Sequence, residues 1–201
     1  MHLALIALFA VAIWWGFDDW QQREIDRAPG LLVSVEPAQL DIAAALPFKV
    51  GKYTLTPRAE FGVTARVLAT ERYRIDTMAD LIPRDMALGW GPMSDSSLLA
   101  NIDISQSGRF YFWRPRAARS ATTMASMEMI IASSSNMHLI PANANVARVI
   151  DRARVGHIIE LEGQLVDVRA DGGWQINTSL SRTDTGAGAC EIIYVERATT
   201  R

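Results

Sequence analysis

The residues best suited to chemistry gather near the end of the chain, in residues 178–196, which read T-S-L-S-R-T-D-T-G-A-G-A-C-E-I-I-Y-V-E. Cys190 is the single cysteine of the chain, and Asp184 precedes it in the same segment. With His138 from elsewhere in the chain, these side chains would supply a thiol nucleophile, a base and an orienting carboxylate. The pattern has low specificity, because G-x-S-x-G is absent and no histidine follows Cys190.

The same segment also suits a tight connection between two strands. Gly186 and Gly188 permit backbone angles that a Cβ disfavours, and the short Asp184 carboxylate can accept hydrogen bonds from N–H groups that a turn leaves unpaired. Cys190 would then be a small apolar side chain at the start of a strand. We therefore predict a strand, a turn and a strand, without catalytic residues. Catalysis by Cys190, Asp184 and His138 is the alternative.

The loop G-W-G-P-M-S-D, residues 89–95, is the strongest candidate for ligand binding. Two glycines and a proline give it an irregular backbone, and Trp90 and Met93 are large apolar side chains to place on a loop. Trp90 either closes the end of a barrel or lines a cleft with Arg109 and His138. We count these four side chains as predicted binding residues.

Residues 110–113 read F-Y-F-W and are flanked by arginines. In a strand, Tyr111 and Trp113 share one face and the two phenylalanines the other, so one of these faces belongs to the core. An exposed aromatic pair beside arginines suits single-stranded nucleic acid. It suits an edge strand against protein or lipid headgroups equally well. Tyr111 and Trp113 complete the set of predicted binding residues.

The sequence predicts neither a metal site nor a cofactor. Its three histidines are spread over the chain, without H-x-x-x-H or C-x-x-C spacing. An oxygen-only site from Asp80, Asp85 and Asp95 is the one alternative, because Ca²⁺ accepts carboxylates. These acids have no EF-hand spacing, so we expect them to be surface residues.

Composition indicates one globular domain with an appendage. The chain has 201 residues, of which 49% are hydrophobic and 21% charged, and this balance supports a packed core. The formal net charge of −2 gives no overall attraction to the phosphates of nucleic acid. One cysteine excludes an internal disulfide and leaves the redox compartment open.

Residues 1–17, M-H-L-A-L-I-A-L-F-A-V-A-I-W-W-G-F, form an apolar run without Lys, Arg, Asp or Glu. As a helix the run spans about 25 Å, the short end of what a bilayer core requires. A cleaved signal peptide is the alternative, with Ala10-Val11-Ala12 as the cleavage motif. We expect an uncleaved transmembrane anchor in the bacterial inner membrane, crossing once, with the following domain in the periplasm. The arginines that follow the anchor would instead place the domain on the cytoplasmic side of the membrane.

The remaining chain divides into a stalk, residues 18–46, and a globular domain, residues 47–201. Alternating apolar residues predict strands at 50–56, 59–70, 108–113, 137–141, 157–169, 174–180 and 191–195. Short helices are expected at 95–101, capped by Ser94, and up to Arg154, capped by Asn143 or Asn145. Gly163 lies in the middle of a strand, where small barrels bend. We predict an α+β, β-rich fold with an OB-like or SH3-like barrel.

Four motifs together resemble an uncharacterised family of short membrane-anchored bacterial proteins. They are D-L-I-P-R-D-M-A-L-G-W-G-P-M-S-D, I-S-Q-S-G-R-F-Y-F-W-R, S-S-N-M-H-L-I-P-A and S-L-S-R-T-D-T-G-A-G-A-C-E. The resemblance covers roughly residues 54–196. It implies an N-terminal anchor ahead of one globular domain, and it implies no activity.

The leading functional hypothesis is a membrane-tethered, non-enzymatic module that binds another envelope protein or an envelope ligand. It depends on the apolar N-terminus and on the lack of a complete catalytic set. The first alternative is an envelope hydrolase or transferase that uses the Ser/Asp/Cys loop with a histidine. The second is an OB-like protein that binds single-stranded nucleic acid.

Overall fold

The computed structural model describes residues 23–116, 121–182, 184, 186 and 188–201. The predicted anchor, residues 1–17, lies outside this part of the chain, as does the beginning of the predicted stalk. Among the described residues, no helix combines the length and the apolar character that crossing a membrane requires.

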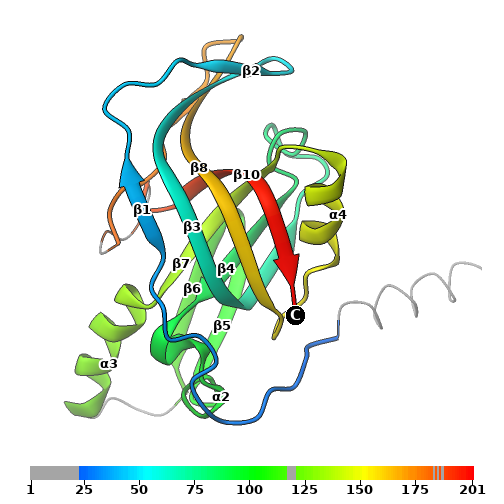
Figure 1. The fold of residues 1–201 in the computed structure, drawn as a ribbon. Helices are drawn as coiled ribbons and strands as arrows, with labels where there is room; N and C mark the ends of the chain where they lie inside the picture. Colours follow the sequence, from blue (N-terminus) through cyan, green and yellow to red (C-terminus); the bar gives the residue numbers. More distant parts are fainter. Residues whose placement is uncertain (1–22, 117–120, 183, 185, 187) are drawn as a thin grey trace, which may run out of the picture.

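Strands dominate the described part, which confirms the prediction of a β-rich α+β fold (Figure 1). The strands are β1 (Ala38–Asp41), β2 (Phe48–Val50), β3 (Tyr53–Arg72), β4 (Arg84–Gly89), β5 (Ile102–Ser107), β6 (Phe110–Pro115), β7 (Ser134–Pro141), β8 (Ile158–Ala170), β9 (Gln175–Ile176) and β10 (Glu191–Thr200). The helices are a 3₁₀ turn (Gly91–Ser94), α2 (Ser96–Leu99), α3 (Ala121–Ala132) and α4 (Ala144–Arg152).

The central sheet closes on itself. Its strands follow the order β3, β4, β7, β10, β8, and β8 pairs with β3 again. β7 and β10 are parallel, whereas the other pairs in this ring are antiparallel. α4 connects β7 to β8 and packs beside β7 and β10. Because β7 and β10 are parallel neighbours, a hairpin cannot join them, and α4 is part of the long connection between them.

β3 is one 20-residue strand where the sequence predicted two. Phe61, Val63, Ala65 and Val67 face the core as their alternation predicts. The gap between the two predicted strands, at residues 57–58, is instead an irregularity in the pairing of β3 with β8. One edge of β3 pairs with β1 near its middle and with β4 towards its end, so a single long strand serves several neighbours.

Gly163 allows two strands to approach closely. A Cβ at this position would lie 2.0 Å from the main-chain oxygen of Tyr194, much closer than real atoms come. The pairing register of β10 shifts between Val195 and Arg197, next to this contact. The glycine is thus required where β8 and β10 curve around the barrel.

Several local predictions need correction. Asp95, and not Ser94, caps α2, because its carboxylate accepts from the main-chain N–H of Ser97 at 2.8 Å. The strand predicted at 174–180 shortens to β9, and the chain from there to β10 is irregular. Asn143 caps α4 as predicted, accepting from the N–H groups of Asn145 and Val146.

The described part of the predicted stalk packs against the barrel. The main-chain N–H of Ile25 donates to the oxygen of Val155 at 2.9 Å. Val33 is 5% exposed and belongs to the main core. The Ser94 hydroxyl holds this region, accepting from the main-chain N–H of Val33 at 3.0 Å. The segment is drawn blue in Figure 1, and it runs along the barrel before β1.

β5 and β6 form a separate two-stranded hairpin that covers the outer side of β3 and β4 and contacts the beginning of β7. Gly108 and Arg109 make its two-residue turn, with φ of 58° and 69°. Both angles are positive, as a type I′ turn requires. Tyr111 and Trp113 pack inwards against Leu68, Ala87, Met93, Ile102 and Ile130.

Candidate binding groove

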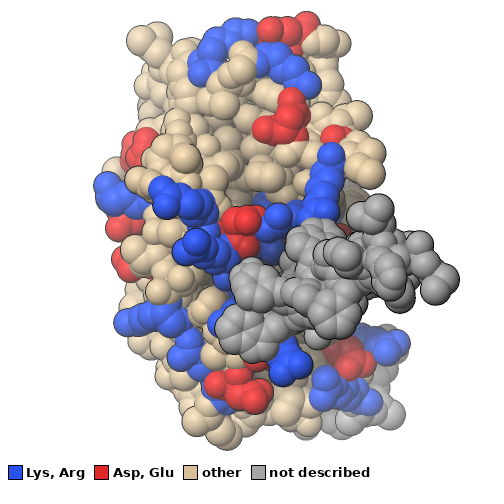
Figure 2. Space-filling view, turned by 90° about the vertical axis from the view of Figure 1, so that its right-hand side faces the viewer, with Lys and Arg blue, Asp and Glu red and all other residues tan. Residues whose placement is uncertain are grey.

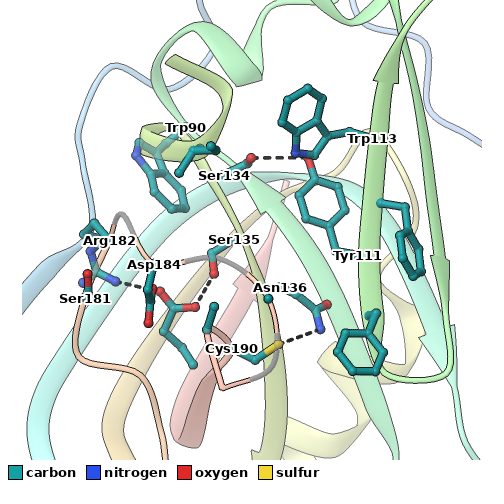
Figure 3. A pocket seen from close by; sticks show the side chains of 16 residues that line it. Trp90, Tyr111, Trp113, Ser134, Ser135, Asn136, Ser181, Arg182, Asp184 and Cys190 are labelled. Atoms are coloured by element: carbon teal, nitrogen blue, oxygen red, sulfur yellow. Dashed lines mark hydrogen bonds and ion pairs between the residues drawn. The ribbon is translucent and has the colours of Figure 1, made fainter. Parts of the chain in front are cut away.

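A groove of about 230 Å³ lies between β6, the beginning of β7 and the loop before β10. We call it the β6 groove. Figure 3 shows its side chains from close by, with β6 along one side and the loop before β10 along the other. We call this loop, residues 177–190, the closing loop. Most of its lining comes from three segments: residues 110–113, residues 134–136, and Ser181, Arg182, Asp184, Gly186, Ala189, Cys190 and Glu191 of the closing loop and the start of β10. Trp90 and Ile131 complete the lining.

The β6 groove follows the edge of a strand. Phe110, Tyr111, Phe112 and Trp113 all line it, although successive side chains of a strand point to opposite faces. A cavity that contacts both faces must therefore run along an edge. One edge of β6 pairs with β5, so the groove follows the other edge.

The main chain at this edge has hydrogen-bonding groups that no other described strand pairs with. The N–H of Arg116 donates to the oxygen of Asn101 at 2.9 Å, which fixes the alternation of bonded and non-bonded pairs in the hairpin. Counting back along β6, the N–H and C=O groups of Tyr111 and Trp113 point away from β5. Pro115, which has no N–H, falls in the same outward phase. In the part of the chain that the structure describes, no other strand pairs with β6.

The aromatic side chains of β6 divide between solvent and core. Phe110 and Phe112 are 46% and 52% exposed, and their ring centroids are 6.4 Å apart. The Tyr111 hydroxyl lies 3.3 Å from the Ser134 hydroxyl, and burial raises the pKa of Tyr111 to about 12. Its phenol is therefore neutral at physiological pH. The exposed pair is thus the phenylalanines, and Trp113 packs inwards with Tyr111.

The opposite wall contains a buried carboxylate. Glu191 is 1% exposed and accepts hydrogen bonds from the Ser135 hydroxyl and from Nη1 of Arg182, the latter at 2.9 Å. Burial raises the pKa of Glu191, against the opposite effects of Ser135 and Arg182. The Arg182 guanidinium also donates to Gln39 at 2.8 Å and lies 4.9 Å from the Phe61 ring centroid. These contacts fix the closing loop on the barrel.

The closing loop has the predicted glycine conformations but a different polar contact. Gly186 and Gly188 have φ of 87° and 94°. The Asp184 carboxylate accepts from the Ser179 hydroxyl at 2.6 Å, and the Ser179 N–H donates to the oxygen of Cys190 at 3.0 Å. The loop is therefore connected across its own base, from Ser179 to Cys190.

Cys190 lines the groove, and its histidine neighbour is buried behind it. Nδ2 of Asn136 lies 3.5 Å from the Cys190 sulfur. His138 is 3% exposed, with Nδ1 2.8 Å from Oδ1 of Asp85, which is fully buried. Burial lowers the pKa of His138, but contacts with Asp85 and with Cys190 outweigh it and raise this pKa to about 9. The ring is thus protonated at neutral pH and lies between the Asp85 carboxylate and the Cys190 sulfur.

Arg109 completes a buried ion network with Asp85. Its guanidinium donates to Asp76 at 2.6 and 2.8 Å, to Asp85 at 3.2 Å and to the main-chain oxygen of Ile82 at 3.0 Å. It also lies 3.9 Å from the centre of the Tyr73 ring. Hydrogen bonding from Arg109 lowers the pKa of Asp76. The network holds the turn of the hairpin onto the barrel.

The structure thus divides the predicted site residues into two groups. Trp90, Tyr111, Trp113, Asp184 and Cys190 line the β6 groove. Met93, Arg109 and His138 are buried outside its lining, and Trp90 itself is 1% exposed within the main core.

Sequence reasoning missed the buried carboxylate of Glu191 and its partners Ser135 and Arg182. A charged residue opening an otherwise apolar strand was the available signal, because a buried acid requires hydrogen-bond donors from elsewhere in the chain.

The acids considered for a cation site are engaged separately. Asp80 binds Lys52 and Tyr53, Asp85 belongs to the buried network, and Asp95 caps α2. Among the residues that are described, no three His, Cys, Asp or Glu side chains form a metal-binding group.

Comparison of the chain with known protein families, with curated proteins and with solved structures finds no match. The resemblance to membrane-anchored bacterial proteins therefore stays a prediction. What the β6 groove binds follows only from its own geometry and chemistry.

Proposed function

We propose that the protein is a membrane-tethered, non-enzymatic binding module of the bacterial envelope, and that its β6 groove receives an extended polypeptide segment of another envelope protein. The observation that supports this proposal is the edge of β6 along the groove, which pairs with no other strand of the described chain. An added strand would bond the outward N–H and C=O groups of Tyr111 and Trp113. Its side chains would pack beside the exposed Phe110 and Phe112.

We further propose an OB-like barrel as the scaffold. Five strands in a closed ring, with one parallel pair, support it. So does α4, which lies between the third and fourth strands of the ring in chain order. The β5–β6 hairpin is then an insertion between the second and third barrel strands, and this insertion carries the groove.

The tether is proposed from the apolar residues 1–17. A single crossing of the inner membrane with the domain in the periplasm is the matching localisation. The contacts of Ile25 with Val155 and of Arg27 with Gly156 would hold the domain close to such an anchor. Short tethers raise the effective concentration of a domain near partners in the same membrane.

Photocrosslinking tests the proposed partner. Phe112 is replaced by a photoreactive phenylalanine in the full chain, and cells of the native host are irradiated. The matched control carries the same residue at Ile75, which is 96% exposed and lies outside the groove lining. We expect a polypeptide adduct at position 112 that is absent at position 75. Equal adducts, or none at position 112, would contradict a groove that binds protein.

A thiol-dependent hydrolase or transferase is the second candidate. The observation that favours it is the position of Cys190 in the groove wall, in contact with Asn136 and His138. The position of His138 favours the non-enzymatic proposal over it, because this ring is 3% exposed and lies outside the groove lining, where it does not reach a substrate. Cys190→Ala decides between them. In a binding module, this variant still forms the polypeptide adduct at position 112, whereas a thiol enzyme with this substitution loses all turnover.

Nucleic-acid binding gains no comparable support. Arg114 and Arg116, which flank the aromatic strand, both bind Asp103, at 3.1 and 2.8 Å. The exposed aromatic pair is Phe110 and Phe112. A test for stacking on nucleic-acid bases should therefore replace these two residues by alanine and measure single-strand binding.

A further inference from the structure

A second hollow, of about 330 Å³, lies between the end of β3, the beginning of β4 and α4. Four arginines line it, Arg72, Arg74, Arg84 and Arg148, together with one acid, Asp151. We call it the arginine pocket. Figure 2 looks onto the side of the molecule that carries α4 in Figure 1 and shows basic side chains gathered across the middle of this face.

The positive charge of the arginine pocket is local. The whole chain has a formal net charge of −2, whereas the charged side chains of this lining are four arginines and one aspartate. Arg72 is paired with Asp151. Arg148 donates to uncharged groups of α4, the oxygen of Ala144 and the amide oxygen of Asn145. Like charges repel when they gather in a hollow, and a bound anion removes this cost.

Arg84 makes the floor of the pocket rigid. It is 6% exposed, and its Nη1 donates to the main-chain oxygens of Ile150 at 2.9 Å and Asp151 at 2.6 Å. These carbonyls end α4, where a cation complements the helix dipole. Arg84 therefore supplies a fixed positive charge beneath the more exposed guanidinium groups of Arg74 and Arg148.

We propose that the arginine pocket binds a phosphate group. The planar guanidinium matches phosphate oxygens in pairs, which makes arginine the side chain best suited to phosphate recognition. Pro83, Pro141 and Tyr73 give the pocket apolar walls, and such walls strengthen charge interactions by excluding water. This site does not depend on the β6 groove.

The phosphate has two possible sources, a lipid headgroup or a free phosphate compound. Ile25 and Arg27 bond the chain just after α4, at Val155 and Gly156. An anchor formed by residues 1–17 would therefore bring the side of the domain that carries α4 close to the lipid headgroups. A free phosphate compound would bind through the same guanidinium groups without the membrane.

NMR titration of the full chain in non-ionic detergent tests the site. The probes are inorganic phosphate, a short-chain phosphatidylglycerol and the corresponding zwitterionic phosphatidylcholine, each at constant ionic strength. We expect the Nε–Hε signals of Arg74 and Arg148 to shift with the anionic probes. Tighter binding of phosphatidylglycerol than of phosphate assigns the site to lipid, and equal or weaker binding assigns it to a free phosphate compound.

A double variant, Arg74→Gln with Arg148→Gln, checks that the pocket is responsible. Both side chains are exposed, so the fold does not require them. The dissociation constant should rise about tenfold or more, since each charge-assisted bond to phosphate is lost. Arg58→Gln is the matched control, because this arginine pairs with Asp167 away from α4. Unshifted arginine signals with both anionic probes, or equal losses in the control, would overturn the proposal.

Discussion

Replacing His138 should change how the stability of the protein depends on pH. The pKa of His138 is raised to about 9 in the folded protein, from an ordinary value of 6.5. A histidine whose pKa is raised by folding stabilises the folded state fully below the unfolded pKa. This contribution disappears as pH rises through the folded pKa. For His138, the loss should therefore occur between about pH 6.5 and about pH 9.

The magnitude follows from the difference between the two pKa values. The difference is about 2.5 pH units, and each unit corresponds to 1.36 kcal/mol, so the contribution is about 3 kcal/mol. Its physical origin is the contact of the buried ring with Asp85 and Cys190, which outweighs desolvation. Urea unfolding of the wild type and of His138→Gln, measured from pH 6 to pH 10, gives the free energy of unfolding of both.

We expect the wild type to lose about 3 kcal/mol more than His138→Gln over this range. His157→Gln is the matched control, because burial lowers the pKa of His157 and so moves its titration below pH 6.5. This control should keep the wild-type slope between pH 6.5 and pH 9. Parallel curves for the wild type and His138→Gln would refute the protonated, ion-paired His138.

Three further changes test the fold. Gly163→Ala should destabilise the protein by about 3 kcal/mol or prevent folding, because the new Cβ meets the Tyr194 oxygen; Gly172→Ala, at a position with open space, is its control in a thermal melt. Asn143→Ala should cost about 1 kcal/mol in urea unfolding through the lost cap of α4, and a cost near zero would contradict the cap. Asp184→Ala should cost about 1 kcal/mol through the lost Ser179 bond, and an unchanged melt with lost function would instead indicate a chemical site.

The sequence predicts the barrel strands well where one face is buried. The alternation in residues 59–70 and 157–169 places the inward residues of β3 and β8 correctly. Side chains alternate between the two faces of a strand, so every second residue faces the core and is apolar. Asn143 was also identified, since a helix cap is local. Gly163 stood out because a glycine inside an alternating strand marks a bend or a close approach, although its neighbour Tyr194 lies on another strand. The sequence predicted a barrel but not which strands close it, because the pairing of β3 with β8 joins residues far apart in the chain.

The candidate site was predicted only in part for the same reason. Trp90, Tyr111 and Trp113 line the β6 groove, and each belongs to a local motif that stands out in the sequence. The groove itself arises where β6, β7 and the closing loop meet, and no local pattern encodes that meeting. Arg109 and His138 were expected at a cleft, yet they are buried in an ion network whose partner Asp85 lies on a different strand.

Amide hydrogen exchange along β6 tests the proposed function most directly. In the free protein, the N–H groups of Tyr111 and Trp113 should exchange rapidly, whereas those of Phe112 and Arg114, which bond β5, should be protected. A synthetic peptide of the segment crosslinked at position 112 is then added. We expect Tyr111 and Trp113 to become protected while Phe112 and Arg114 stay as they were. Binding of the peptide without protection of these two amides would contradict strand addition at the β6 edge.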